Sequence, residues 1–121
     1  MKPPCASQLA PNAPWLPESG LPEHAWLKLQ QVFENTPQVQ RVTLFGSRAQ
    51  GKHRAGSDID LCVRAPGMAA HELWVLDAAI DDLLLPWKVD LLLEHTIDHV
   101  ELLDHIRRVG RPFYVRHAPG L

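Results

Sequence analysis

The feature that most constrains this chain is an apolar strand that ends on Gly46-Ser47 and is followed, after ten intervening residues, by Asp58 and Asp60. Residues two apart on a strand point to the same face, so we expect the two aspartates to stand side by side while the residue between them faces a core. At about 6.5 Å and an effective dielectric of about 20, their charges repel by about 2.5 kcal/mol. A hard divalent cation is the expected way to offset that cost.

Composition limits the alternatives. The 121 residues suffice for one compact domain, and a net charge of −2 with 21% charged residues gives no basic excess, so we expect no direct nucleic-acid binding. Cys5 and Cys62 do not make a disulfide framework, which favours a cytoplasmic protein. The first residues lack the apolar stretch of a secretory signal, and no run has the length of a membrane helix.

The chain divides into a proline-rich head and one layered domain. Six of the eleven prolines fall within the first 22 residues, so we expect residues 1–20 to be irregular, with Trp15 and Leu16 apolar enough to dock on a domain of residues 21–121. Apolar periodicity and helix-breaking residues in that domain predict a helix over 22–35, a strand over 39–45, a short helix or turn over 47–51 and a loop over 52–56. They then predict a strand over 58–64, a helix from residue 68 to Leu85 and a strand over 88–93. A helix capped by Thr96 and closed by Gly110, and a short strand at 113–115, complete the domain.

The Gly46-Ser47 turn is a candidate phosphate-binding site. A glycine at a strand end lets backbone N–H groups approach a ligand, and a serine adds a hydroxyl donor, although an ordinary capped turn would look the same. The run Gly46-x-x-x-x-Gly51-Lys52 also resembles the Walker A loop. It departs from that motif at His53, where a Ser or Thr would bind magnesium, and Gly56-Ser57 would end any helix too early.

Asp90 decides between two interpretations of Asp58 and Asp60. Alone, the pair could be exposed charges on an edge strand. Asp90, however, interrupts a strongly apolar strand, and a lone acid there is costly unless it finds a partner or a metal. Three acids from two strands beside a phosphate-binding turn indicate two-metal phosphoryl or nucleotidyl transfer, and carboxylates with substrate phosphates suit Mg²⁺ better than zinc.

These motifs together resemble the polymerase-beta-like nucleotidyltransferase superfamily and, within it, the minimal nucleotidyltransferase (MNT) domains. The likeness spans about residues 22–115 and rests on Leu44-Phe45-Gly46-Ser47-Arg48-Ala49, Gly51, Ser57-Asp58-Ile59-Asp60-Leu61, Val89-Asp90-Leu91 and Arg111-Pro112-Phe113-Tyr114. The resemblance implies an α+β fold, with a small mixed β-sheet flanked by helices.

The resemblance also implies residue roles. Gly46 and Ser47 would hold the β/γ-phosphates of ATP, Asp58 and Asp60 would bind Mg²⁺, and Asp90 would complete the two-metal site and act as general base. Arg48 is either a third phosphate contact or a solvated or structural arginine. Gln50 stands where many relatives carry arginine, a departure that bears on phosphate affinity or partner contact more than on the chemistry.

MNT domains of this kind resemble antitoxins paired with helical HEPN-domain toxins. The resemblance therefore implies transfer of AMP from ATP to a hydroxyl, expected to be a tyrosine, of a HEPN partner, with which the chain could form an oligomer. One alternative is a nucleotide-binding subunit that neutralises the partner by contact without turnover. A second alternative is transfer of the nucleotide to a small molecule or to a nucleic-acid end. Relatives with those activities generally add another domain to hold the acceptor, for which 121 residues leave no room.

Overall fold

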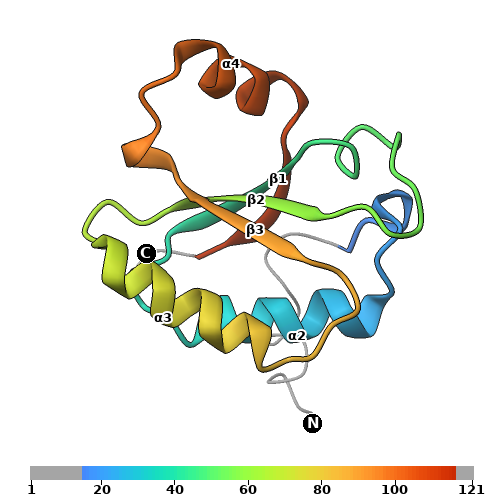
Figure 1. The fold of residues 1–121 in the computed structure, drawn as a ribbon, viewed down its shortest axis with the longest axis horizontal. Helices are drawn as coiled ribbons and strands as arrows, with labels where there is room; N and C mark the ends of the chain where they lie inside the picture. Colours follow the sequence, from blue (N-terminus) through green and yellow to red (C-terminus); the bar gives the residue numbers. More distant parts are fainter. Residues whose placement is uncertain (1–14, 117–121) are drawn as a thin grey trace, which may run out of the picture.

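The computed structural model describes residues 15–116, which form a four-stranded sheet with helices on both faces (Figure 1). The α+β fold implied by the resemblance is confirmed. In chain order the elements are η1 (Pro17–Ser19), α2 (Glu23–Glu34), β1 (Arg41–Phe45), β2 (Ile59–Arg64), α3 (Ala70–Asp81), β3 (Val89–Leu93), η2 (Glu94–Thr96), α4 (Val100–Val109) and β4 (Arg111–Val115). Most of the predicted head, residues 1–14, lies outside the described residues, so the domain division at residue 20 stays a prediction.

The sheet is mixed, with strand order β3-β2-β1-β4. β1 pairs antiparallel with β2 and β4, whereas β2 and β3 are parallel. The register places Phe45 opposite Asp60 and Asp60 opposite Asp90. Because paired residues in a sheet share a face, Asp60 and Asp90 project from the same side of the sheet.

One face of the sheet carries the main core under α2 and α3 (Figure 1). α2 begins directly after Pro22, whose fixed φ suits a helix start. Trp26, Leu29 and Phe33 recur along one side of this helix and are fully buried against the sheet. At the other end of α2, Arg116 donates hydrogen bonds to the carbonyls of residues 33, 34 and 36, in the region where a helix runs out of its own N–H donors.

The opposite face is covered in part by α4 (Figure 1). Phe45 of β1 and Cys62 of β2 pack there against Ile106 of α4 in a second, smaller cluster. α4 is amphipathic, with its basic residues in the last turn, as the sequence predicts. Asp60 and Asp90 belong to this second face, which the main core does not fill.

Two helix boundaries differ from prediction. α3 ends at Asp81 rather than Leu85: Leu84 has a positive φ of 56° and is 87% exposed, so it does not extend the apolar stripe. Thr96 does not cap α4, because residues 94–96 form a 3-10 turn in which the Thr96 hydroxyl donates a hydrogen bond to the Leu93 carbonyl. The N-cap is His99, whose Nδ1 accepts a hydrogen bond from the Leu102 N–H. Histidine is not among the preferred N-cap residues, so the sequence does not indicate this role.

The other predicted elements are confirmed within one or two residues. Trp15 and Leu16 pack on the main core, and the Trp15 indole N–H donates to the Leu21 carbonyl over 2.8 Å. Among residues 15–116, no helix is long and apolar enough to cross a membrane.

Candidate active site

Gly46 forms a turn at the end of β1 that no other residue could make without strain. Its φ is +74°, and a Cβ built on it would overlap Oδ2 of Asp60 and lie 3.2 Å from the Cγ atom of that carboxylate. The turn then closes on the Ser47 carbonyl, which accepts from the N–H groups of Gln50 and Lys52. The absent side chain therefore lets the backbone and the Asp60 carboxylate lie against each other.

Asp60 is the acid of the candidate site whose contacts the structure describes most fully. It is partly buried on β2, directly opposite Asp90 of β3. Burial and then the charges of Asp90 and Asp58 raise the pKa of Asp60 above its usual value. Asp60 thus lies near enough to Asp90 and Asp58 for their charges to disfavour its ionised form.

Asp58 is exposed, whereas Asp60 and Asp90 are both partly buried. β2 begins at Ile59, so Asp58 lies in the loop before the strand and not on it, and the expected side-by-side strand pair is Asp60 with Asp90 instead. Lys88 approaches Asp90, with 3.6 Å between Nζ and Oδ1. The Lys88 side chain is 73% exposed and that of Asp90 is 42% exposed, so this ion pair contributes little to stability.

The chemistry of the donors fits magnesium. Carboxylate oxygens are the ligands that this ion prefers, and a bound cation would offset both the burial and the neighbouring charges that raise the pKa of Asp60. Within residues 15–116, no group of three or more His, Cys, Asp or Glu side chains is already gathered closely enough to hold a metal. The three predicted ligands are therefore not gathered around a common point, and their role as a metal triad stays a prediction.

Arg48 lies beneath the turn rather than at its surface. Its side chain is 2% exposed, and its guanidinium donates to the carbonyls of Ser19, Ala55 and Ser57. The Nε bond and one Nη2 bond both go to Ser57, at 3.1 and 2.9 Å, immediately before Asp58. Of the roles left open by the sequence, this geometry favours the structural one: Arg48 ties the loop before β2 to the segment before α2.

The sequence of residues 27–118 matches the family described as Polymerase beta, Nucleotidyltransferase. The chain belongs to the polymerase beta nucleotidyltransferase family. No curated protein matches the chain. A solved toxin–antitoxin with AMP-PNP is 28% identical, with a TM-score of 0.62 over 80% of this chain and 76% of that one.

Two further solved structures share the fold. A mutant MntA–HpeT toxin–antitoxin is 28% identical, with a TM-score of 0.60 over 80% of this chain and 75% of that one. A complex of a tri-AMPylated Shewanella oneidensis HEPN toxin with an MNT antitoxin has a TM-score of 0.60 over 78% and 72%; at 22% identity it bears on the fold alone. The resemblance to MNT domains is thus confirmed.

In this nucleotidyltransferase, side chains that the sequence did not mark as important contact the loop between the Gly46 turn and β2. Trp87 donates its indole N–H to the Ala55 carbonyl over 3.1 Å, and its ring lies 5.6 Å from the Arg48 guanidinium carbon. His53 packs toward Gly20, and its Nδ1 is buried without a hydrogen-bond partner in the described chain. No motif marks these contacts, because the groups that receive the hydrogen bonds are backbone carbonyls.

Proposed function

We propose that this nucleotidyltransferase transfers AMP from ATP to a hydroxyl of a HEPN-domain partner, expected to be a tyrosine, in a Mg²⁺-dependent reaction, and so acts as the antitoxin of the pair. The observation that carries the proposal is the register of Asp60 with Asp90 beside the Gly46 turn. It brings paired acids from two strands to a place where a backbone turn can receive phosphate.

The residues have distinct roles in this proposal. Gly46 and Ser47 hold the β/γ-phosphates through backbone and hydroxyl donors, while Asp58, Asp60 and Asp90 would hold Mg²⁺. When bound, the ion would supply positive charge to the phosphates and to the leaving pyrophosphate. Arg48 acts from beneath, by holding the loop that carries Asp58.

Asp90 is proposed to receive the proton of the attacking hydroxyl. The hydroxyl oxygen forms a bond to the α-phosphorus of ATP, the bond from that phosphorus to the pyrophosphate oxygen breaks, and pyrophosphate leaves. Asp90 suits this task because its side chain is partly exposed and lies opposite Asp60, on the edge strand β3.

The similar structures support a nucleotide and a partner protein. At 28% identity, one is a toxin–antitoxin with AMP-PNP and another is a MntA–HpeT toxin–antitoxin mutant. A HEPN partner and a tyrosine acceptor remain part of the proposal, as does a cytoplasmic location, where ATP is available.

Intact-mass measurement of the co-purified partner after incubation with ATP and Mg²⁺ tests the proposal. We expect a gain of one or more AMP groups that is lost in the Asp58→Ala, Asp60→Ala double variant. Asp81→Ala with Asp82→Ala is the matched control, because it removes two exposed aspartates at the end of α3 and should leave the gain unchanged. A tightly bound partner with no mass change, even with the unmodified chain, would support neutralisation by contact instead.

A further inference from the structure

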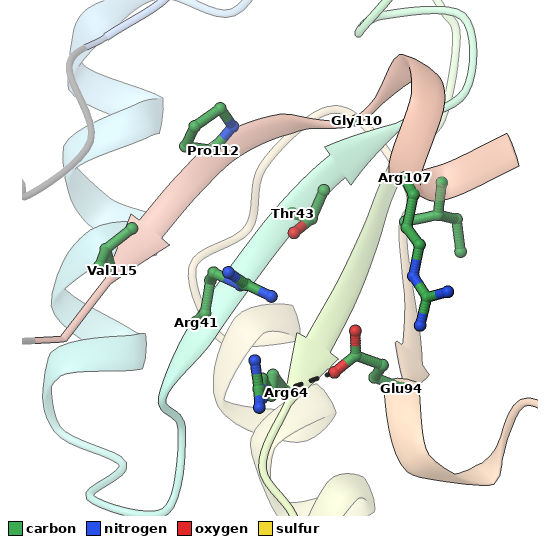
Figure 2. A pocket seen from close by; sticks show the side chains of 9 residues that line it. Arg41, Thr43, Arg64, Glu94, Arg107, Gly110, Pro112 and Val115 are labelled. Atoms are coloured by element: carbon green, nitrogen blue, oxygen red, sulfur yellow. Dashed lines mark ion pairs between the residues drawn. The ribbon is translucent and has the colours of Figure 1, made fainter. Parts of the chain in front are cut away.

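A cavity of about 540 Å³ lies between the sheet and the end of α4. Its lining comes from β1, β2, β4, η2 and α4 and is shown in Figure 2: Arg41, Thr43, Arg64, Glu94, Ile106, Arg107, Gly110, Pro112 and Val115. This volume is in the range of small-molecule sites. None of the three aspartates, Gly46 or Ser47 lines it.

The cavity carries an excess of positive charge. Three arginines and one glutamate line it, which leaves a formal charge of +2. Glu94 is paired with Arg64, with 3.7 Å between its Oε1 and the arginine Nε (Figure 2). Arg41 and Arg107 are exposed and make no ion pair within residues 15–116, so two guanidiniums remain for a ligand.

Backbone geometry brings these arginines together. Arg41 and Arg64 are partners in the β1–β2 register and therefore share a face of the sheet. α4 ends close to that face because Gly110 has no side chain: a Cβ there would overlap the Ile106 carbonyl and the Thr43 methyl group. The close approach places Arg107, in the last turn of α4, on the lining of the same cavity as the two strand arginines.

The cavity is separate from the proposed active site. It opens on the face that carries Asp60, but Arg64 is four residues further along β2, a distance of about 13 Å on an extended strand. A ligand of the size of a phosphate ester could occupy one place without filling the other.

We propose that this cavity binds a small phosphate monoester, independently of the nucleotide that the active site uses. A phosphate monoester carries a charge near −2 at neutral pH, which matches the charge of the lining, and guanidinium groups bind phosphate oxygens in a two-pronged manner. Thr43 adds a hydroxyl, while Ile106, Pro112 and Val115 offer apolar contact to the organic part of the ester.

Phenyl phosphate is a suitable probe, since it joins a dianion to an apolar ring. Titration followed by calorimetry and by amide NMR shifts should show saturable binding at one site, with the largest shifts at Thr43 and Gly110. The affinity should fall about tenfold in Arg41→Gln or Arg107→Gln, the loss expected for one charged hydrogen bond. Arg108→Gln is the matched control: this neighbour is paired with Asp104 over 2.9 Å, does not line the cavity, and should bind as the unmodified chain does.

The same titration on the Asp58→Ala, Asp60→Ala variant separates the two sites and should give an unchanged affinity. Absence of saturable binding, equal weakening by Arg108→Gln, or loss of binding in the double aspartate variant would overturn the proposal. So would a 5′-phosphorylated oligonucleotide that binds far more tightly and is not displaced by phenyl phosphate, since the surface would then serve nucleic acid. Each of these outcomes leaves AMP transfer to a partner untouched.

Discussion

Replacing Gly46 by alanine tests how closely the phosphate-binding turn and the Asp60 carboxylate are fitted together. Two costs are expected in the free energy of unfolding. An alanine held at a φ of +74° costs about 1–2 kcal/mol. The new methyl group would also overlap Asp60 Oδ2, the far end of a partly buried side chain, and turning that carboxylate aside costs about 0.5–1.5 kcal/mol more.

Gly51 separates these two costs, because its φ is +70° but a Cβ there would meet nothing within 4 Å. Gly51→Ala should therefore lose about 1–2 kcal/mol from backbone strain alone. Removing the carboxylate provides a second check: in an Asp60→Ala background, the nearest remaining side-chain atom of residue 60 is its Cβ, at 3.4 Å. The cost of Gly46→Ala should then fall to that of Gly51→Ala.

Urea unfolding of the four combinations of Gly46→Ala and Asp60→Ala, with Gly51→Ala beside them, measures the coupling directly. We expect a coupling free energy of about 0.5–1.5 kcal/mol between positions 46 and 60, which is the cost of turning the carboxylate aside. Equal losses for Gly46→Ala and Gly51→Ala, with no coupling to residue 60, would refute the argument that the absent side chain admits the carboxylate.

Two further predictions concern the surroundings of the acids. Arg48→Met should lower the free energy of unfolding by about 2 kcal/mol, near 1 kcal/mol for each of the Ser19 and Ser57 carbonyls, which lose their donor; the Ala55 carbonyl keeps its hydrogen bond from Trp87. An unchanged urea midpoint would argue against the structural role. Asp60→Asn should raise the Tm at pH 7, because burial and neighbouring charges raise the pKa of Asp60 and its ionised form destabilises the fold. The wild type gains stability as the pH falls through that raised pKa, so the difference in Tm should shrink toward acid pH; a constant or negative difference would contradict the repulsion.

The sequence predicted the elements of the fold well because apolar periodicity and breakers are local signals. Pro22 and the stripe that contains Trp26 marked α2, and glycine marked the end of β1. The errors came where a local signal was overridden. Leu84 fitted a helical stripe but lies in a left-handed turn after α3, and Thr96 had cap chemistry but lies in a 3-10 turn.

For the candidate site, the sequence suggested residues but could not give their arrangement, and the roles of those residues stay predictions. The spacing of Asp58 and Asp60 suggested one strand face, but β2 starts between them, so the strand neighbour of Asp60 is Asp90. Periodicity cannot reveal that β3 lies next to β2 and parallel to it. The arginine cavity could not be foreseen at all, since its lining is drawn from positions 41 to 115 and follows no motif.

Asp90→Asn tests most directly the claim that the chain transfers AMP through these acids. Asp90 lies on a different strand from Asp60, and its proposed role as general base rests on the pairing of the two strands. The variant should retain the partner while the ATP-dependent mass gain of that partner disappears under single-turnover conditions. Asp98→Asn, which changes an exposed aspartate between η2 and α4, serves as the matched control and should preserve the gain. A full gain of AMP mass at an unchanged rate with Asp90→Asn would contradict the assignment of the site.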